Sequence, residues 1–169
     1  MQRDEDFTAY MGGRWATLVR SAVLLGCAQP GAEDVVQTTL ARCYAAWSKV
    51  SRAGNRDAYV YRMLVNARID SRRRRWWGER PTATPPEDAD PADPLADVDV
   101  TDAVERALSG LTSDHRAVIV LRFYSHLSEQ ETAEALGIAL GTVKSRTSRA
   151  LAELAGNEHL ADTPDGKAP

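Results

Sequence analysis

Apolar residues recur every three or four positions in several stretches of this chain, which is the spacing of helices that bury one face. The first such stretch spans residues 7–25 and is weakened by Gly12 and Gly13. Its inward positions are Met11, Trp15, Leu18, Ala22 and Leu25. After a turn at residues 27–31, a second helix is predicted. Its inward positions are Val36, Leu40, Cys43, Tyr44 and Trp47.

A third helix is predicted from about residue 58 to 77, after a polar and basic loop at residues 48–57 that contains Gly54-Asn55. Its buried positions are expected to be Tyr61, Leu64, Val65 and Ile69. The helix ends in the sequence RRRRWW at residues 72–77. Four adjacent arginines cannot all pack inward, and tryptophans offer flat faces on which bases stack. The alternative is a solvated helix end whose tryptophans belong to the core.

Five prolines interrupt residues 81–99 among alanines and acids, a composition that cannot bury enough apolar surface to order itself. Helical period resumes after this stretch, and Thr112 is expected to cap a further helix. The apolar positions of this second region are Val100, Val104, Leu108, Leu111, Val118 and Leu121. We therefore predict an all-α chain with two small helical domains, at 1–80 and 100–156, a flexible acidic linker at 81–99, and a frayed tail at 157–169.

The stretch from Leu127 to Leu154 reads as a helix-turn-helix. Ser128 and Glu131 have the spacing of a capping box, which predicts a helix start near Glu129. Ala133 permits close approach of the next helix, Gly137 supplies the turn, and Val143 recurs at the buried position.

The second helix of this motif keeps Val143, Thr147, Ala150, Leu151 and Leu154 on one face. The opposite face and its flank carry hydroxyl and basic groups, which suit phosphates and base edges. These candidate DNA contacts are Thr142, Lys144, Ser145, Arg146, Ser148 and Arg149. The alternative is an ordinary amphipathic hairpin with a few exposed arginines, but a solvated helix usually mixes both signs of charge.

The formal net charge of -3 hides an uneven distribution. From Arg52 to Arg80, nine arginines face three acidic residues, a local balance of +6. From Pro81 to Asp102, seven acidic residues face no basic residue, a balance of -7. The chain is basic where it could touch DNA and acidic in between.

Cys27 and Cys43 do not form a C-x-x-C pair, and the three histidines lack metal-ligand spacing. We expect both cysteines to be reduced and buried, and we expect no metal and no cofactor. The longest apolar run, at residues 22–28, is too short for a membrane span, and the start MQRDEDF does not resemble a signal peptide. A cytoplasmic protein that does not insert into membranes is expected.

Three stretches resemble the extracytoplasmic-function (ECF) sigma factors of the sigma-70 family. They are AEDVVQTTLARCYAAW at 32–47, AYVYRMLVNARIDSRRRR at 58–75 and LSEQETAEALGIALGTVKSRTSRAL at 127–151. The resemblance covers nearly the whole chain, and VKSR after Gly-Thr is its most specific signal. The end RRRRWWGERP resembles an actinobacterial sigma-E-like branch.

This resemblance implies a protein without catalytic residues that binds core RNA polymerase, through its clamp helices and flap, and directs it to promoter DNA. It implies polymerase contacts at Asp34, Gln37 and Thr38. The implied minus-ten contacts are Ser51, Arg52, Asn55, Arg56, Asn66, Asp70, Arg72, Arg73, Arg74, Arg75 and Trp76. The second domain would read the minus-thirty-five element, and an anti-sigma factor is an implied partner.

Two rival classes remain at this point. A self-sufficient helix-turn-helix regulator would bind duplex DNA alone as a dimer, and a helical adaptor would bind only protein. The regulator would need a receiver, a ligand pocket or a dimer helix, whereas residues 1–80 offer an arginine-aromatic surface and an exposed Asp34-Gln37 pair. The adaptor would leave the separation of basic and acidic segments unexplained.

Overall fold

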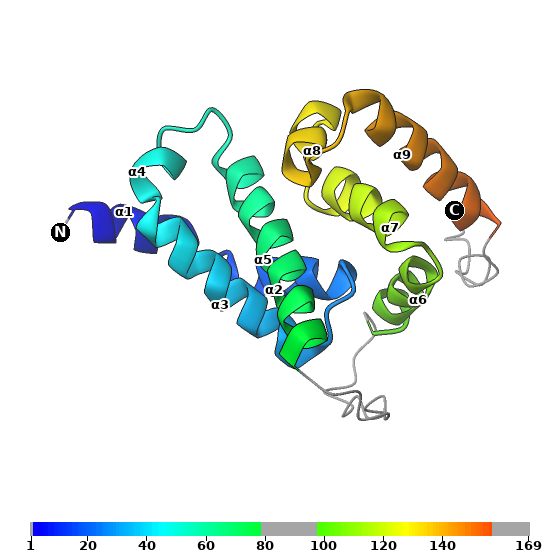
Figure 1. The fold of residues 1–169 in the computed structure, drawn as a ribbon, viewed down its shortest axis with the longest axis horizontal. Coiled ribbons are helices and arrows are strands. Elements are labelled where there is room, and N and C mark those ends of the chain that lie inside the picture. The colour runs from blue at the N-terminus through cyan, green and yellow to red at the C-terminus, as the bar shows by residue number, and fades with distance from the viewer. Residues whose placement is uncertain (1, 79–97, 157–169) are drawn as a thin grey trace, which may run out of the picture.

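The computed structural model describes residues 2–78 and 98–156, and every regular element in these ranges is helical (Figure 1). The first range forms α1 (Gln2–Met11), α2 (Trp15–Leu24), α3 (Gln29–Ala45), α4 (Trp47–Val50) and α5 (Arg56–Gly78). The second forms α6 (Val98–Ser109), α7 (Ser113–Ile119), a π-helical turn η1 (Val120–Tyr124), α8 (Glu129–Leu136) and α9 (Leu140–Ala155). The predicted all-α class with two helical regions is confirmed.

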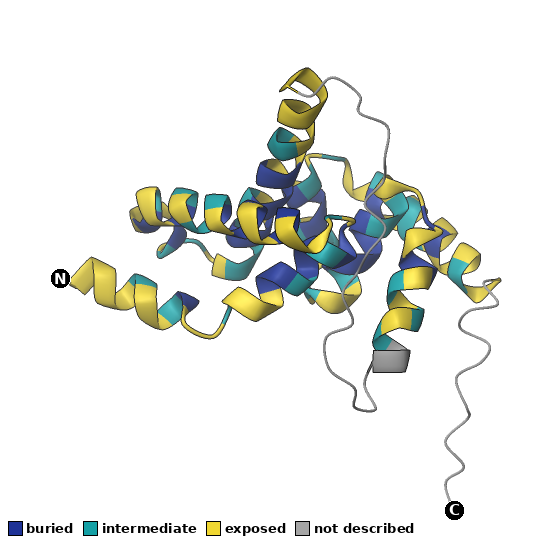
Figure 2. Cartoon of the chain, turned by 90° about the horizontal axis from the view of Figure 1, so that it is seen from below, coloured by how far each residue is buried: buried dark blue, intermediate teal, exposed yellow. Residues whose placement is uncertain are grey.

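The core of the first region lies where α2, α3 and α5 pack together. Leu25, Val36, Leu64 and Val60 are almost completely buried there. Figure 2 shows the buried segments gathered at the centre of the molecule, with the last turns of α5 projecting from it as an exposed helix end.

Three inward positions predicted for this region are wrong, because Trp15, Tyr44 and Ile69 are 39%, 42% and 46% exposed. The chain breaks at Gly12-Gly13 into α1 and α2, so Trp15 starts a new helix with a different phase. The ring of Tyr44 packs edge-on against Phe7 of α1 and not into the core. Ile69 follows the buried Arg68 and lies on the same side of α5 as the exposed Arg62 and Asn66.

Two predicted connections are shorter in the structure than in the sequence analysis. The turn after α2 ends at Ala28, and α3 begins at Gln29 with Pro30 in its first turn, where the missing N–H costs nothing. The predicted loop at 48–57 contains α4 and ends where α5 begins at Arg56. Asn55 Oδ1 accepts a hydrogen bond of 3.1 Å from Ala58 N, as an N-cap does.

Among the positions whose burial is described, the second region follows its predicted pattern with two exceptions; the side chain of Val100 lies outside them. Thr112 caps α7 by accepting a hydrogen bond of 3.2 Å from His115 N, as expected. Val104 and Leu151 were expected to face inward but are 38% and 45% exposed. Leu151 lies at the edge of the apolar stripe of α9, whereas Val104 lies one turn before the first buried residues of α6. Helix α6 begins at Val98, inside the linker expected at 81–99. The rest of that linker and the tail lie outside the described residues.

The two regions contact each other directly, with α5 packed against α8 and α2 against η1. Arg20 of α2 forms an ion pair with Glu105 of α6. Apolar residues of both regions, including Leu25 and Leu121, belong to one continuous core cluster. The chain therefore adopts a closed arrangement in which the two regions share an interface.

Candidate nucleic-acid interface

The helix-turn-helix has the local geometry that its sequence predicts. The Ser128 amide donates to Glu131 Oε2 at 2.8 Å, and the Glu131 amide donates to Ser128 Oγ at 3.1 Å, which completes the capping box. The hydrogen bond from the Ser128 backbone holds the pKa of Glu131 below its usual value. Gly137 ends α8 in the left-handed conformation with φ 65°, and Ala133 and Val143 are buried between α8 and α9.

The basic side chains of α9 differ in how they are held. Arg146 is half-buried, and its Nη2 lies 2.8 Å from Asp114 Oδ2 of α7. Lys144 is exposed, with its Nζ 3.8 Å from Glu129 Oε2. Arg149 is exposed and has no ion pair within the described ranges. Arg149 is therefore the arginine of α9 that is free to reach outward, while Arg146 turns towards α7.

The hydroxyl residues of α9 lie on the same helix as these cations. Ser145 and Ser148 are exposed, and Thr142 is half-buried. Ser145 Oγ donates to the Thr142 carbonyl at 3.1 Å, so this hydroxyl keeps its acceptor capacity for an incoming group.

The end of α5 presents the arginine run and both tryptophans to solvent. Trp76 and Trp77 are 85% and 84% exposed, which excludes the alternative that they belong to the core. The arginines divide between two sides of the helix. Arg73 and Arg74 line a shallow surface with Asp70, whereas Arg72 and Arg75 face the start of α3.

The predicted minus-ten loop lies between α4 and α5. Arg52, Asn55 and Arg56 are exposed and Ser51 is half-buried. Asn55 Nδ2 donates to Glu131 Oε1 of α8 at 2.6 Å, so its amide is engaged by the second region.

The remaining residues expected at this surface lie further along α5. Asn66 is exposed. Asp70 Oδ2 accepts from Arg42 Nη2 at 2.8 Å, which occupies one of its oxygens.

The expected polymerase contacts lie on α3, away from the arginine run. Asp34 and Gln37 are exposed about one turn apart, and Thr38 is half-buried beside them. Their neighbours Val35 and Val36 are buried, so α3 presents a polar face to solvent and an apolar face to the core.

One residue at this interface was missed by the sequence analysis. Arg68 of α5 is buried, with its Nη2 3.3 Å from Ser113 Oγ of α7. The signal was present, because Arg68, Arg72 and Arg75 have the i, i+4, i+7 spacing of one helical face. Cys27, expected to be buried, is only half-buried and lies beside this face.

These features define a two-part helical DNA-binding protein with a helix-turn-helix at one end and an arginine-tryptophan helix end at the other. Family models agree with both parts: Sigma-70 region 2 matches residues 13–78, and Sigma-70, region 4 matches residues 101–154. The chain belongs to the sigma-70 family of RNA polymerase sigma factors, and it is a sigma factor of the ECF type. Membership of this family excludes the two alternative classes, a self-sufficient helix-turn-helix regulator and a helical adaptor.

Relatives support this assignment over most of the chain. The chain is 37% identical to the RNA polymerase sigma-E factor of Streptomyces coelicolor over 88% of its own length and 84% of the relative. It is also 37% identical to the ECF RNA polymerase sigma factor SigM of Mycobacterium tuberculosis, over 82% of its own length and 69% of the relative. The resemblance to a sigma-E-like branch is thus matched by named relatives.

Solved structures share the fold. The sigma factor RpoE of Bartonella quintana, in complex with the anti-sigma factor NepR, is similar with a TM-score of 0.73 and 28% identity, over 94% of this chain and 99% of that one. CnrH, in complex with the cytosolic domain of CnrY, is similar in fold with a TM-score of 0.66 and 24% identity, over 96% of this chain and 91% of that one.

Two further observations concern the described part of the chain alone. None of its helices has the length and apolar character needed to cross a bilayer. It also brings together no group of three or more histidine, cysteine, aspartate or glutamate residues that could hold a metal ion.

Proposed function

We propose that this sigma factor divides promoter recognition between two surfaces. The loop at 51–56 and the end of α5 would bind and open the minus-ten element, and the exposed face of α9 would read the minus-thirty-five element. The observation that carries this proposal is the solvent exposure of both the arginine-tryptophan end of α5 and the Ser145–Arg149 face of α9 on separate regions of one chain.

The two surfaces suit different tasks. Exposed tryptophans beside arginines provide stacking faces and phosphate contacts, which a single strand requires. A helix with arginine and hydroxyl groups suits the major groove of a duplex. Because Asn55 donates to Glu131 in the closed arrangement, engagement of a promoter base by Asn55 exchanges this hydrogen bond for one to DNA.

The polar face of α3 would dock on core polymerase through Asp34, Gln37 and Thr38. We expect Asp34→Ala with Gln37→Ala to weaken core binding while the fold survives, because exposed substitutions usually change stability by about 0.5 kcal/mol or less. The matched control is Glu33→Ala, which removes an adjacent exposed carboxylate from the same helix. Equal affinity of the double variant and the control in a titration with core polymerase would contradict the assignment.

The remaining assignments follow from the family. An anti-sigma factor would control the protein, since the similar Bartonella quintana sigma factor is described with one. The domain limits would be 1–80 and 100–156, and the protein would act in the cytoplasm without catalytic activity. Transcription by purified core polymerase with this chain, compared between a cognate and a scrambled promoter, tests the whole proposal. Sequence-independent transcription would contradict it.

A further inference from the structure

Arg68 carries a buried positive charge that has no acidic partner among the residues the structure describes. Its side chain is only 8% exposed, and its Nε has no hydrogen-bond partner. Its Nη2 lies 3.3 Å from the neutral hydroxyl of Ser113, and the guanidinium also interacts with the thiol of Cys27. Burial lowers the pKa of its guanidinium. A buried charge is costly unless an opposite charge compensates it, so the surroundings of Arg68 have the character of an anion site.

Arg68 lines a pocket of about 360 Å³ between the two regions of the chain, together with three more arginines. Arg72 and Arg75 extend the same face of α5, and Arg116 enters from α7. No aspartate or glutamate lines this pocket, and none of the four arginines forms an ion pair within residues 2–78 and 98–156. The opposite side of α5 differs, since Asp70 lies there beside Arg73 and Arg74.

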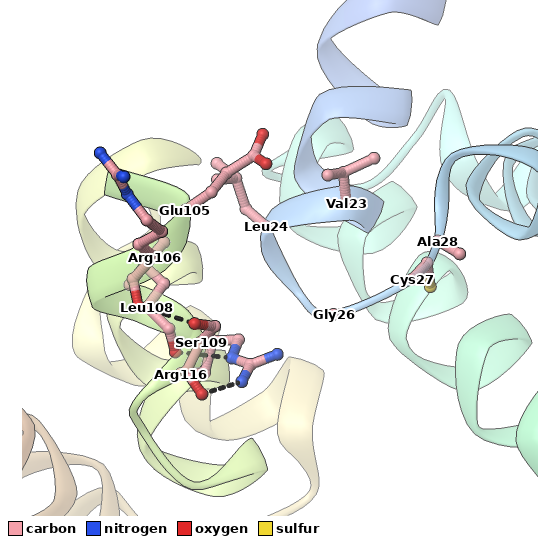
Figure 3. Close-up of a pocket in the computed structure, with 10 residues that line it drawn as sticks. All are labelled: Val23, Leu24, Gly26, Cys27, Ala28, Glu105, Arg106, Leu108, Ser109 and Arg116. Atoms are coloured by element: carbon pink, nitrogen blue, oxygen red, sulfur yellow. Dashed lines mark hydrogen bonds between the residues drawn. The ribbon is translucent and has the colours of Figure 1, made fainter. Parts of the chain in front are cut away.

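Arg116 is held in place by the second region. Its Nε donates to the Leu108 carbonyl at 2.8 Å and its Nη2 to the Ser109 carbonyl at 3.0 Å. Figure 3 shows these hydrogen bonds and the neighbouring part of the interface, where Arg116 lies across from the turn that contains Gly26 and Cys27. Arg116 thus brings a fixed guanidinium to a boundary that the first region also lines.

The N-terminus of α3 borders the same pocket through Ala28 and Gly31. Ala28 caps this helix without a side-chain hydrogen bond, and no acidic residue lies in its first turn. A Cβ on Gly31 would lie 2.5 Å from Arg75 Nη2, and a Cβ on Gly26 would lie 2.5 Å from Arg116 Nη1. The two glycines therefore allow guanidinium groups to approach the positive end of a helix, where anions bind readily.

We propose that this pocket binds a small oligophosphate anion, such as pyrophosphate or the diphosphate end of a nucleotide. Guanidinium groups match phosphoryl oxygens in pairs of hydrogen bonds, and a cluster of four suits a multiply charged ligand. The volume lies at the lower end of the range of small-molecule sites, about 300 to 1,000 Å³. Because Arg68, Arg72 and Arg75 come from one region and Arg116 from the other, a bound oligophosphate holds the two regions together. Arg72 and Arg75 also belong to the arginine run proposed above for promoter DNA, so the pyrophosphate titration contains no DNA.

The experiment is calorimetric titration of the full chain with inorganic pyrophosphate at constant ionic strength, without polymerase or promoter. Wild type is expected to bind at a single site. Arg72→Gln with Arg75→Gln should weaken binding at least about tenfold, because two guanidinium groups that would donate charge-assisted hydrogen bonds to the anion are lost. The matched control is Arg73→Gln with Arg74→Gln, which removes the same charge from the other side of α5. It should bind within about twofold of wild type, since it loses only screened long-range attraction.

A second measurement locates the ligand. Cys27 lines the pocket and is half-buried, whereas Cys43 is fully buried. Burial raises the pKa of both thiols, and it raises that of Cys43 to about 11. Pyrophosphate should therefore slow alkylation of Cys27 by iodoacetamide, a neutral reagent, in wild type and in the control. An unchanged alkylation rate in the presence of bound pyrophosphate would place the ligand elsewhere and overturn the proposal.

Two outcomes of the titration would also overturn it. An equal loss of pyrophosphate affinity in both double variants would show that binding depends only on the overall charge of the protein. Binding of a short single-stranded oligonucleotide through Arg72 and Arg75, with no binding of pyrophosphate, would make the pocket a nucleic-acid backbone contact. Either failure leaves the transcription test of the proposed function unaffected, because that test contains no added oligophosphate.

Discussion

The basic residues at the end of α5 and those on α9 are held in different ways. On α9, Arg146 and Lys144 each have a carboxylate of the same region within 4 Å, at 2.8 and 3.8 Å. In the run at 72–75, no arginine forms an ion pair within the part of the chain that the structure describes. An acidic partner fixes the direction of a basic side chain and partly neutralises its charge. A cation without such a partner keeps its full positive charge and its choice of rotamers.

This difference matches two ways of contacting DNA. Phosphate contacts need positive charge and tolerate many geometries, whereas a base contact needs a side chain aimed within a groove. The unpaired run at 72–75 suits the first task, and the ordered face of α9 suits the second. We expect the same division in how variants of the two helices respond to salt and to promoter sequence.

The largest effect is expected when all four arginines at 72–75 are replaced by glutamine. Promoter complexes should weaken on the order of 100-fold at moderate salt, and the slope of log affinity against log salt should fall by about 3 to 4, near 0.9 per lost phosphate contact. Binding of a promoter fragment by holoenzyme at several salt concentrations measures both quantities.

The matched control for this variant replaces the same four arginines by lysine. Charge is retained, so the salt slope should stay close to that of wild type even if bidentate contacts are lost. A changed preference for minus-ten bases with unchanged affinity would contradict the assignment of the run to phosphates.

A smaller effect is expected for Arg149→Ala on α9. Because Arg149 is exposed on the face of α9 that also carries Ser145 and Ser148, we expect it to read a base edge, and its loss should flatten the preference at one base pair by about 1 to 3 kcal/mol. Lys144→Ala is the control. It should lower transcription from all promoters by a similar factor and reduce the salt slope of promoter binding by about one. Transcription from a library of minus-thirty-five variants measures these profiles. A profile that Arg149→Ala leaves intact would refute the base contact.

Asp114→Asn should leave Arg146 of α9 without an acidic partner, as the arginines at the end of α5 are. Removing this carboxylate frees Arg146 from its ion pair, so the salt slope of promoter binding should increase by up to about one. Stability should change by less than about 1 kcal/mol, because Asp114 is mostly exposed. Glu134→Gln removes an exposed acid of α8 that forms no ion pair in the described ranges, and it should leave the slope nearer to wild type. Equal slopes for the two variants would show that Asp114 does not restrain Arg146.

The smallest effect concerns Glu131, which caps the helix that supports α9. Hydrogen bonding to the Ser128 backbone lowers the pKa of Glu131 in the folded chain. Its contribution is therefore complete above the pKa of the unfolded chain, near 4.5, and is lost as pH falls through the lower folded value. Glu131→Gln should lower the free energy of unfolding by less than about 1 kcal/mol at pH 7. The difference in unfolding free energy between this variant and wild type should become smaller as pH falls below about 4. Thermal unfolding at both pH values measures this, and a constant difference would refute the capping role of the carboxylate.

Much of the helix-turn-helix could be predicted because its signals are local. The capping box at Ser128 and Glu131, the left-handed Gly137 and the buried Val143 depend on residues within about one or two turns of each other. The inward positions Trp15, Tyr44 and Ile69 could not be predicted in this way. Their exposure depends on where a helix breaks and on which of its faces the neighbouring helices cover.

The sequence by itself determined the all-helical class, the resemblance to ECF sigma factors and the separation of basic from acidic segments, because periodicity, capping and charge are read along the chain. Only the tertiary structure decided which cations are restrained and which are free. The partner of Arg146 is 32 residues away at Asp114, and Arg68 meets Ser113 from 45 residues away. Contacts over such distances depend on how the helices pack, and this packing also brings Arg116 to the face of α5.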